Sequence, residues 1–231
     1  MKYKRVLLKL SGEAILGDGE IINYSKLTEI CNVIKLCTEE GVQFGIVIGG
    51  GNIWRGRSGK SYDQARSDHM GMLATVINAL AVLDVLESIG VEARLATAIT
   101  MQTIAEPYSY RRAISNMNKG SVMLLACGTG SPFFSTDTAA ALRAAEIRAD
   151  VLMKATMVDG VYDKDPKKFT DAVKFDTLSF DEVLNKNLKV LDNTASAMCK
   201  NNGTKLLVFS ISDPMNIYKA CSGEHIGTIV E

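Results

Sequence analysis

Short apolar runs alternate with longer amphipathic stretches along most of the chain. The run at 6–10 is almost entirely apolar, as expected for a strand buried on both faces of a sheet. Residues 26–40 then place apolar side chains at helical spacing and end at Gly41, and a second apolar run follows at 44–48. Strand, helix, strand is the unit from which parallel sheets are built.

The same alternation continues to the carboxyl terminus. It predicts further helices at 65–89, 107–119 with Pro107 near its first turn, 138–147, 180–185 and 195–201, and a short one after 212–214. It predicts further strands at 92–95, 122–127, 151–155 and 205–209, with an edge strand at 227–230. We therefore expect an α/β protein, a three-layer α/β/α sandwich with a mainly parallel central sheet. No linker divides the chain, so residues 1–231 are expected to form a single domain.

Composition limits the binding partners and the cellular compartment that we expect for this protein. Twenty-six basic residues balance 26 acidic ones, so no global field attracts nucleic acid or an anionic membrane. No uninterrupted apolar run reaches the roughly 18 residues that span a bilayer. The apolar stretch before Lys9 is too short for a signal peptide. Five cysteines without a Cys-x-x-Cys pair argue against disulfides and zinc. A cytoplasmic protein without nucleic-acid or membrane partners is expected.

Four loops that suit phosphate groups follow apolar runs. They are Lys9-Leu10-Ser11-Gly12, the triplet Gly49-Gly50-Gly51 with Asn52, the stretch 128–137, and the stretch 154–166. In a parallel sheet such loops gather beyond the carboxyl ends of the strands. The pattern therefore predicts a phosphate-binding site at one edge of the sheet.

Two strand-end lysines and one aspartate are the candidate catalytic groups. Lys9 lies late on a buried strand, a costly place for an ammonium group unless it reaches an anion, or extends to water. Lys154 repeats that position after 151–153, which favours a role in phosphate binding. Asp137 precedes an alanine-rich helix, where it could be a plain helix cap, could orient both lysines, or could attract Mg²⁺.

Several loop residues are candidates for direct contact with a nucleotide. The glycine triplet lets backbone amides approach a phosphate. Arg55 could bind a phosphate bidentately, through two nitrogens of its guanidinium. Phe133 and Phe134 lie in a polar loop, where they form either a surface for a base or a plain hydrophobic plug.

Across essentially its whole length the chain resembles the amino acid kinase superfamily, and within it the bacterial uridylate kinases, which use ATP to make UDP from UMP. The motifs that carry the resemblance are Lys-Leu-Ser-Gly-Glu-Ala from Lys9, Gly-Gly-Gly-Asn-Ile-Trp-Arg-Gly from Gly49, Asp-His-Met-Gly-Met-Leu-Ala-Thr from Asp68, Gly-Thr-Gly-x-Pro-Phe-Phe-x-Thr-Asp from Gly128, and an Asp-Gly-Val-Tyr segment that ends in Asp165-Pro166.

The resemblance implies roles for individual residues. Lys9 and Lys154 would stabilise the moving phosphoryl group, and Asp137 would hold them in place. The ATP site would comprise Lys9, Leu10, Ser11, Gly12, Gly51, Arg55, Thr156, Tyr162 and Asp165. The UMP site would comprise Gly50, Arg55, Asp68, Thr129, Gly130, Ser131, Pro132, Phe133, Phe134, Ser135 and Thr136. The amino-terminal part of the chain would thus bind mainly UMP and the carboxyl-terminal part mainly ATP.

For Arg55 and Asp68 the resemblance implies a specific contact with UMP. Arg55 would lie near the UMP phosphate, and Asp68 would accept hydrogen bonds from the ribose hydroxyls. From the sequence pattern, Asp68 could instead be an exposed residue in the first turn of a helix, where acidic side chains are favoured.

The resemblance also implies Mg²⁺ with ATP, although no protein ligand for the metal is identified. It implies UTP as a feedback inhibitor and a homohexamer built from dimers that pack through central helices. Two alternatives stay open: a carboxylate or carbamate kinase of the same superfamily, and a non-catalytic nucleotide-storage protein of the same fold. The aromatic, threonine-rich loop 129–136 suits a base and a ribose, and the two lysines with Asp137 favour turnover.

Overall fold

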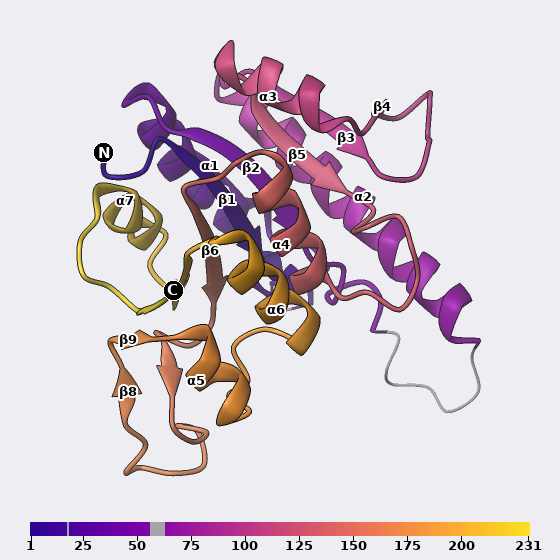
Figure 1. The fold of residues 1–231 in the computed structure, drawn as a ribbon. Coiled ribbons are helices and arrows are strands. Elements are labelled where there is room, and N and C mark those ends of the chain that lie inside the picture. The colour runs from indigo at the N-terminus through magenta and orange to yellow at the C-terminus, as the bar shows by residue number, and fades with distance from the viewer. Residues whose placement is uncertain (18, 56–62) are drawn as a thin grey trace.

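A continuous twisted sheet runs through the computed structural model of the chain, which describes residues 1–17, 19–55 and 63–231 (Figure 1). Within these residues the sheet has nine strands in the order β4-β3-β5-β2-β1-β6-β10-β11-β9. Neighbouring strands are parallel except for the antiparallel pair β10 and β11. The strands are β1 (Arg5–Leu10), β2 (Gln43–Ile48), β3 (Ala93–Thr97), β4 (Glu106–Pro107), β5 (Val122–Ala126), β6 (Val151–Thr156), β9 (Thr177–Leu178), β10 (Leu206–Ser210) and β11 (Thr228–Val230). A separate antiparallel pair joins β7 (Val161–Tyr162) and β8 (Lys174–Phe175).

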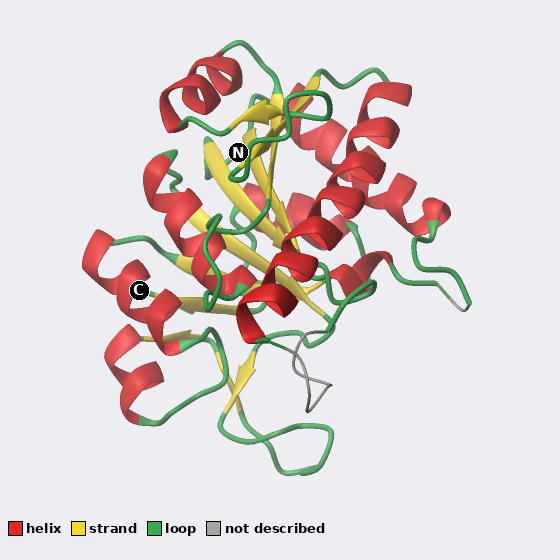
Figure 2. Ribbon diagram, turned by 90° about the vertical axis from the view of Figure 1, so that its right-hand side faces the viewer, coloured by secondary structure: helices red, strands yellow, loops and turns green. Residues whose placement is uncertain are grey.

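Helices cover both faces of the sheet, which gives the expected three layers (Figure 2). One face packs against α1 (Tyr24–Glu39), α2 (Gln64–Ser88) and α7 (Met215–Ser222). The other packs against α3 (Tyr110–Asn118), α4 (Thr136–Glu146), α5 (Phe180–Asn185) and α6 (Asn193–Asn202). A short 3₁₀ helix, η1 (Gly12–Ile15), follows β1. The prediction of a mainly parallel α/β/α sandwich is confirmed.

The two faces of the central strand explain where its lysine points. Val6, Leu8 and Leu10 pack into the core beneath α1, α2 and α7, whereas Leu7 packs beneath α4 and α6. Because side chains alternate along a strand, Lys9 shares the face of Leu7. Strand β6 lies in register beside β1, so that Lys154 is the direct neighbour of Lys9. Both lysines therefore belong to the α4 face of the sheet.

The observed elements differ from the predicted ones in a few places. Pro107 lies in β4 and not in a helix: residues 106–107 pair with β3, and the helix begins at Tyr110 after the N-cap Ser109. The segment 227–230 is not an edge strand, because β9 pairs with the far side of β11. The short strands β4, β7, β8 and β9 were not predicted, since two residues are too few to show a period.

Helix α2 keeps an apolar surface on its outer side. Met70, Leu73, Ile77 and Leu80 follow at helical spacing and are all exposed, between 38% and 50%. By length and average composition α2 is apolar enough to cross a membrane, although no uninterrupted apolar run suggested it. Its apolar window is 56% buried against the rest of the molecule, so one such helix is weak evidence for a membrane span.

Candidate active site

The carboxyl ends of β1 and β6 lie where the strand order reverses. From β1 the chain passes through α1 to β2 on one side, and from β6 it passes through α5 and α6 to β10 on the other. Ligands of open α/β sheets bind outside such a point. A cleft of about 1000 Å³ opens there. The predicted site residues that line it are Lys9, Ser11, Gly12, Gly50, Gly51, Arg55, Asp68, Thr129, Phe133, Phe134, Ser135, Thr136, Asp137 and Lys154.

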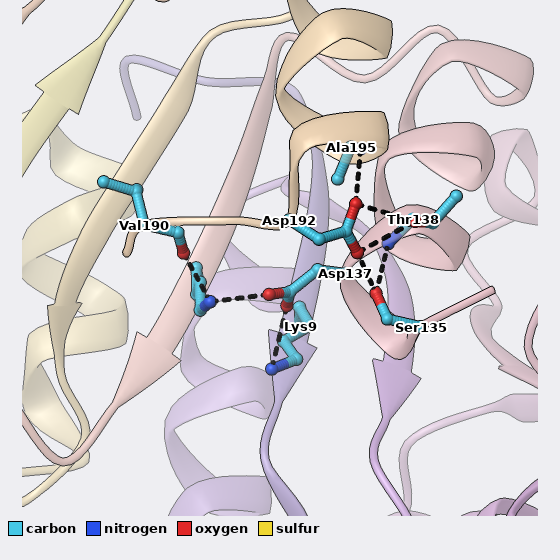
Figure 3. Close-up of polar contacts among 8 residues, drawn as sticks. Lys9, Ser135, Asp137, Thr138, Val190, Asp192 and Ala195 are labelled. Carbon is cyan, nitrogen blue, oxygen red and sulfur yellow. Dashed lines mark hydrogen bonds and ion pairs between the residues drawn. The ribbon is translucent and has the colours of Figure 1, made fainter. Parts of the chain in front are cut away.

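Two ammonium groups share one carboxylate at the floor of this cleft (Figure 3). Lys9 Nζ lies 3.1 Å from Asp137 Oδ1, and Lys154 Nζ lies 2.8 Å from Asp137 Oδ2. Lys154 also donates a hydrogen bond of 2.6 Å to the carbonyl of Val190. The three charged side chains are only 12–18% exposed. Two positive charges against one negative charge leave this floor ready to receive an anion.

The protonation of the floor follows from burial and charge. Burial opposes ionisation of Asp137, but Lys9 and Lys154 outweigh it and hold the pKa of this carboxyl below its ordinary value. For Lys154 burial comes first and lowers its pKa, Lys9 lowers it further, and Asp137 offsets only part of the shift. Asp137 is therefore a fixed anion near neutral pH, and Lys154 releases its proton more readily than an ordinary lysine.

The amino termini of α4 and α6 are tied together by a second aspartate (Figure 3). Asp192 caps α6 by accepting a hydrogen bond of 2.8 Å from the amide of Ala195. Its carboxylate also accepts hydrogen bonds from the hydroxyls of Ser135 and Thr138 in the first turn of α4. Ser135 in turn accepts from the amide of Thr138 and caps α4. Asp137 is thus held where two capped helices meet.

The glycine triplet serves two purposes. A Cβ at Gly50 would lie 2.8 Å from Ala74 Cβ and from the Gly71 carbonyl oxygen, so glycine lets α2 pack directly on the loop. A Cβ at Gly51 would meet open space on the cleft side. None of the three lies in the left-handed region of backbone conformation, so turn geometry does not explain the triplet. Close packing explains Gly50, whereas no protein atom within 4 Å restricts Gly51.

Asp68 fixes the loop that contains the two phenylalanines. Its carboxylate accepts a hydrogen bond of 2.7 Å from the amide of Phe133 and another of 2.7 Å from the Gln64 side chain. Asp68 is therefore more than an exposed residue of the first helical turns. Phe133 and Phe134 are 74% and 50% exposed, so they do not form a hydrophobic plug and are free to contact a ligand.

Seven predicted site residues do not line the cleft in the described part of the chain. They are Leu10, Gly130, Ser131, Pro132, Thr156, Tyr162 and Asp165. Leu10 is fully buried in the core. Thr156 and Tyr162 make local hydrogen bonds, to the carbonyl of Val158 and to Asp159 respectively. The predicted adenosine contacts thus lie on a separate segment, beyond the floor.

The structure adds cleft residues to which the sequence assigned no individual role, although Gly49 and Gly128 belong to the predicted phosphate-binding loops. They are Glu13, Gly49, Trp54, Gln64, Ser67, Gly71, Met72, Thr75, Gly128, Lys189, Val190, Leu191 and Asp192. The N-cap signal of Asp192 was available, because a capping side chain precedes a helix that was itself predicted. The contact of Asp192 with Ser135 could not be predicted from the sequence, since 57 residues separate the two.

Among the described residues no group of three or more His, Cys, Asp or Glu side chains is placed to hold a metal ion. Asp137 and Asp192 both line the cleft, and lysines, hydroxyls and a helix amide already bond to their carboxylates. A cation in this cleft would depend on oxygen ligands that a bound phosphate supplies.

Comparison with known proteins agrees with this geometry. Residues 4–210 match the model of the amino acid kinase family. The crystal structure of UMP kinase from Bacillus anthracis is 35% identical, covers 100% of this chain and 97% of its own, and superposes with a TM-score of 0.96. That of UMP kinase from Ureaplasma parvum is 36% identical, covers 100% of both chains, and gives 0.94. Uridylate kinase from Archaeoglobus fulgidus is 29% identical, covers 98% of this chain and 99% of its own, and gives 0.75. The chain belongs to the amino acid kinase family.

Proposed function

We propose that this protein is a UMP kinase, which transfers the γ-phosphoryl group of ATP to UMP and yields UDP and ADP in pyrimidine nucleotide synthesis. The observation that carries the proposal is the floor of the cleft, where Lys9 and Lys154 lie side by side with Asp137 between them. Sequence identity of 35–36% over the full length to two proteins known as UMP kinases favours UMP as the acceptor over a carboxylate or a carbamate.

Phosphoryl transfer asks little covalent chemistry of the protein. It requires the acceptor and the donor in line and the charge on the transferred group neutralised. A UMP phosphate is already ionised at neutral pH, so no general base is needed. Lys9 and Lys154 stabilise the charge on the moving phosphoryl group, while Asp137 keeps both ammonium groups at its position.

The two substrates approach the floor from different sides. UMP lies against the loop from Thr129 to Thr136, with its phosphate near Arg55 and its ribose near Asp68. ATP places its phosphates along Ser11, Gly12 and Gly51, and its adenosine near the segment that contains Thr156, Tyr162 and Asp165. In a single domain, the amino-terminal part thus binds mainly UMP and the carboxyl-terminal part mainly ATP.

Mg²⁺ enters this site with ATP. The described residues supply no carboxylate cluster for a resident ion, which suits a cation carried by phosphate oxygens and water. When bound, Mg²⁺ would neutralise part of the phosphate charge. The residues themselves bind, orient and shield the phosphates.

The acceptor is identified by a coupled assay of ADP release. Mg·ATP is supplied with UMP, CMP, AMP, glutamate, aspartate or carbamate, and nucleotide binding is measured in parallel by calorimetry. UMP is expected to give the highest turnover. If no acceptor raises ADP release above background while nucleotides still bind, a storage protein replaces the kinase; if glutamate, aspartate or carbamate is best, the carboxylate or carbamate alternative is right.

Assembly and regulation belong to the same proposal. We expect a cytoplasmic homohexamer whose dimers pack through α2, because Leu73, Ile77 and Leu80 form an apolar stripe that water would otherwise cover. Sedimentation should show a hexamer, and Ile77→Lys should shift it to smaller species.

UTP is expected to inhibit the enzyme, and kinetics at varied UMP concentration test that expectation. Neither nucleic acid nor membranes are expected as partners.

A further inference from the structure

A buried arginine lies behind the loop that faces the acceptor. Arg143, near the carboxyl end of α4, is only 4% exposed. Its Nη1 pairs with Glu146 at 2.7 Å, and its guanidinium lies 4.0 Å from the ring centre of Tyr108. Its Nη2 donates a hydrogen bond of 3.0 Å to the carbonyl of Gly128. A charge in such a place is costly unless each of its partners is satisfied.

Tyr108 contacts both Arg143 and Glu146. Its hydroxyl donates a hydrogen bond of 2.6 Å to Glu146 Oε2, the same oxygen that pairs with Arg143. Burial raises the pKa of Tyr108, and the bond to Glu146 raises it further, so the phenol stays protonated and remains a donor. The arginine is thus held by an acid and by an aromatic face, and only its second nitrogen is directed at the loop.

The backbone that Arg143 holds is an unusual one. Cys127, Gly128, Gly130 and Phe133 all have positive φ angles, of 64°, 58°, 86° and 71°. For Cys127 and Phe133 this conformation costs free energy, since a side chain disfavours it. Such a backbone persists only when surrounding contacts fix it. At its far end the amide of Phe133 is fixed by Asp68, and at its near end the carbonyl of Gly128 is fixed by Arg143.

We propose that Arg143 is a positioning residue for the acceptor: braced by Glu146 and Tyr108, it fixes the Gly128 carbonyl and thereby sets the backbone on which the nucleoside monophosphate rests. The inference deepens the proposed function and depends on it for the identity of that acceptor. Arg143 does not line the cleft, so its effect passes through residues 128–134. A planar guanidinium stacks on a ring while its fixed fork donates to an acid and a carbonyl, whereas the compact ammonium of a lysine has no planar face to stack.

The test compares Arg143→Lys with Tyr108→Phe, and uses Arg148→Lys as the matched control. Arg148 follows the same helix and is exposed, so the same chemical change there leaves the loop untouched. Hydrogen exchange is followed at the amides of Gly130 and Phe133, and binding of UMP and of Mg·ATP is measured separately. Arg143→Lys should speed exchange at both amides, weaken UMP about tenfold and leave Mg·ATP within about twofold, since one charged hydrogen bond is lost on one side only.

Tyr108→Phe removes one hydroxyl and keeps the ring, so a loss of about threefold for UMP is expected. It also decides the matter if Arg143→Lys fails to fold. The inference is overturned if exchange and UMP affinity match the parent, or if UMP and Mg·ATP weaken equally. If the parent itself does not bind UMP, the proposed function fails, and faster exchange at Gly130 and Phe133 alone still shows whether Arg143 holds this backbone.

Discussion

The two sides of the cleft are built in different ways. The acceptor loop, residues 128–136, is held from a distance: Asp68 on α2, Arg143 on α4 and Asp192 before α6 each bind it. The donor segment, residues 156–176, is joined to the rest of the molecule near its ends, where Thr228 accepts a hydrogen bond from the amide of Val161 and donates one to the carbonyl of Phe175, whereas its outer hairpin is held mainly by itself. Thr156 bonds to Val158 within its own turn, and Asp163 and Val173 exchange hydrogen bonds across its hairpin.

This difference bears on selectivity. A loop fixed by three separate elements presents one surface, so it can discriminate among acceptors without first ordering itself. The outer hairpin of the donor segment, which exposed local bonds fix, is less costly to rearrange, because few buried contacts oppose its local opening. We infer that the choice of acceptor is built into the fold, whereas the nucleotide donor is accommodated by an adaptable segment. The charged floor belongs to both sides, and changes there should be the most severe.

The largest effect is expected from Lys9→Ala. Lys9 lies on the floor beside Asp137, and its contact with the phosphoryl group should strengthen in the transition state. Turnover should fall by roughly three orders of magnitude with little change in UMP affinity. Steady-state kinetics and calorimetry measure the two quantities. Lys4→Ala, which changes an exposed lysine just before the same strand, is the control. A higher KM with unchanged kcat would mark Lys9 as a ground-state binder only.

Asp137→Asn should be nearly as damaging and should also move the pH profile. Without the carboxylate, two partly buried ammonium groups face each other, and breaking such a pair typically costs about 3–5 kcal/mol of stability. Turnover should fall about a hundredfold, since both lysines lose their position.

The direction of the pH shift in Asp137→Asn follows from the groups that set the pKa of Lys154. Burial and Lys9 already lower the pKa of Lys154, and Asp137 does more than Asp192 to raise it. Removing Asp137 must lower that pKa further, so the alkaline limb of kcat/KM, which reports on the free enzyme, should move to lower pH. If the limb stays in place in Asp137→Asn, Lys154 is not the group that it reports.

Much of this arrangement could be predicted from the sequence. The apolar runs gave the strands, and the strand-end positions of Lys9 and Lys154 placed both at one edge. Their equal register is a property of strand pairing, which a one-dimensional pattern does not contain. The contacts of Val190, Asp192 and Arg143 join segments distant in the chain and leave no periodic trace. For the loop at 128–136, the sequence predicted a position beside the cleft, whereas the contacts that hold the loop could not be predicted.

A smaller effect, mainly on the acceptor side, is expected from Arg55→Lys. Arg55 lies on the rim of the cleft, where its Nε donates to the Gly51 carbonyl and its guanidinium pairs with Glu13. Lysine keeps the charge but loses the planar fork that suits a phosphate. UMP binding should weaken about fivefold by calorimetry, which corresponds to about one ordinary hydrogen bond. Equal affinity in both proteins would remove Arg55 from the UMP site.

Tyr162→Phe should have the smallest effect and tests the donor side of the comparison. The Tyr162 hydroxyl donates to Asp159 within one exposed turn, at 2.7 Å, and this bond raises the pKa of the phenol. Water can replace such a bond, so the KM for ATP should change by no more than about twofold, and the KM for UMP should not change. Tyr108→Phe offers the matched change behind the acceptor loop, where the hydroxyl is part-buried and bonds across 38 residues. If Tyr162→Phe weakens UMP as much as Tyr108→Phe does, the donor segment is as firmly coupled to the acceptor site as the loop itself, and the distinction between a fixed and an adaptable side is wrong.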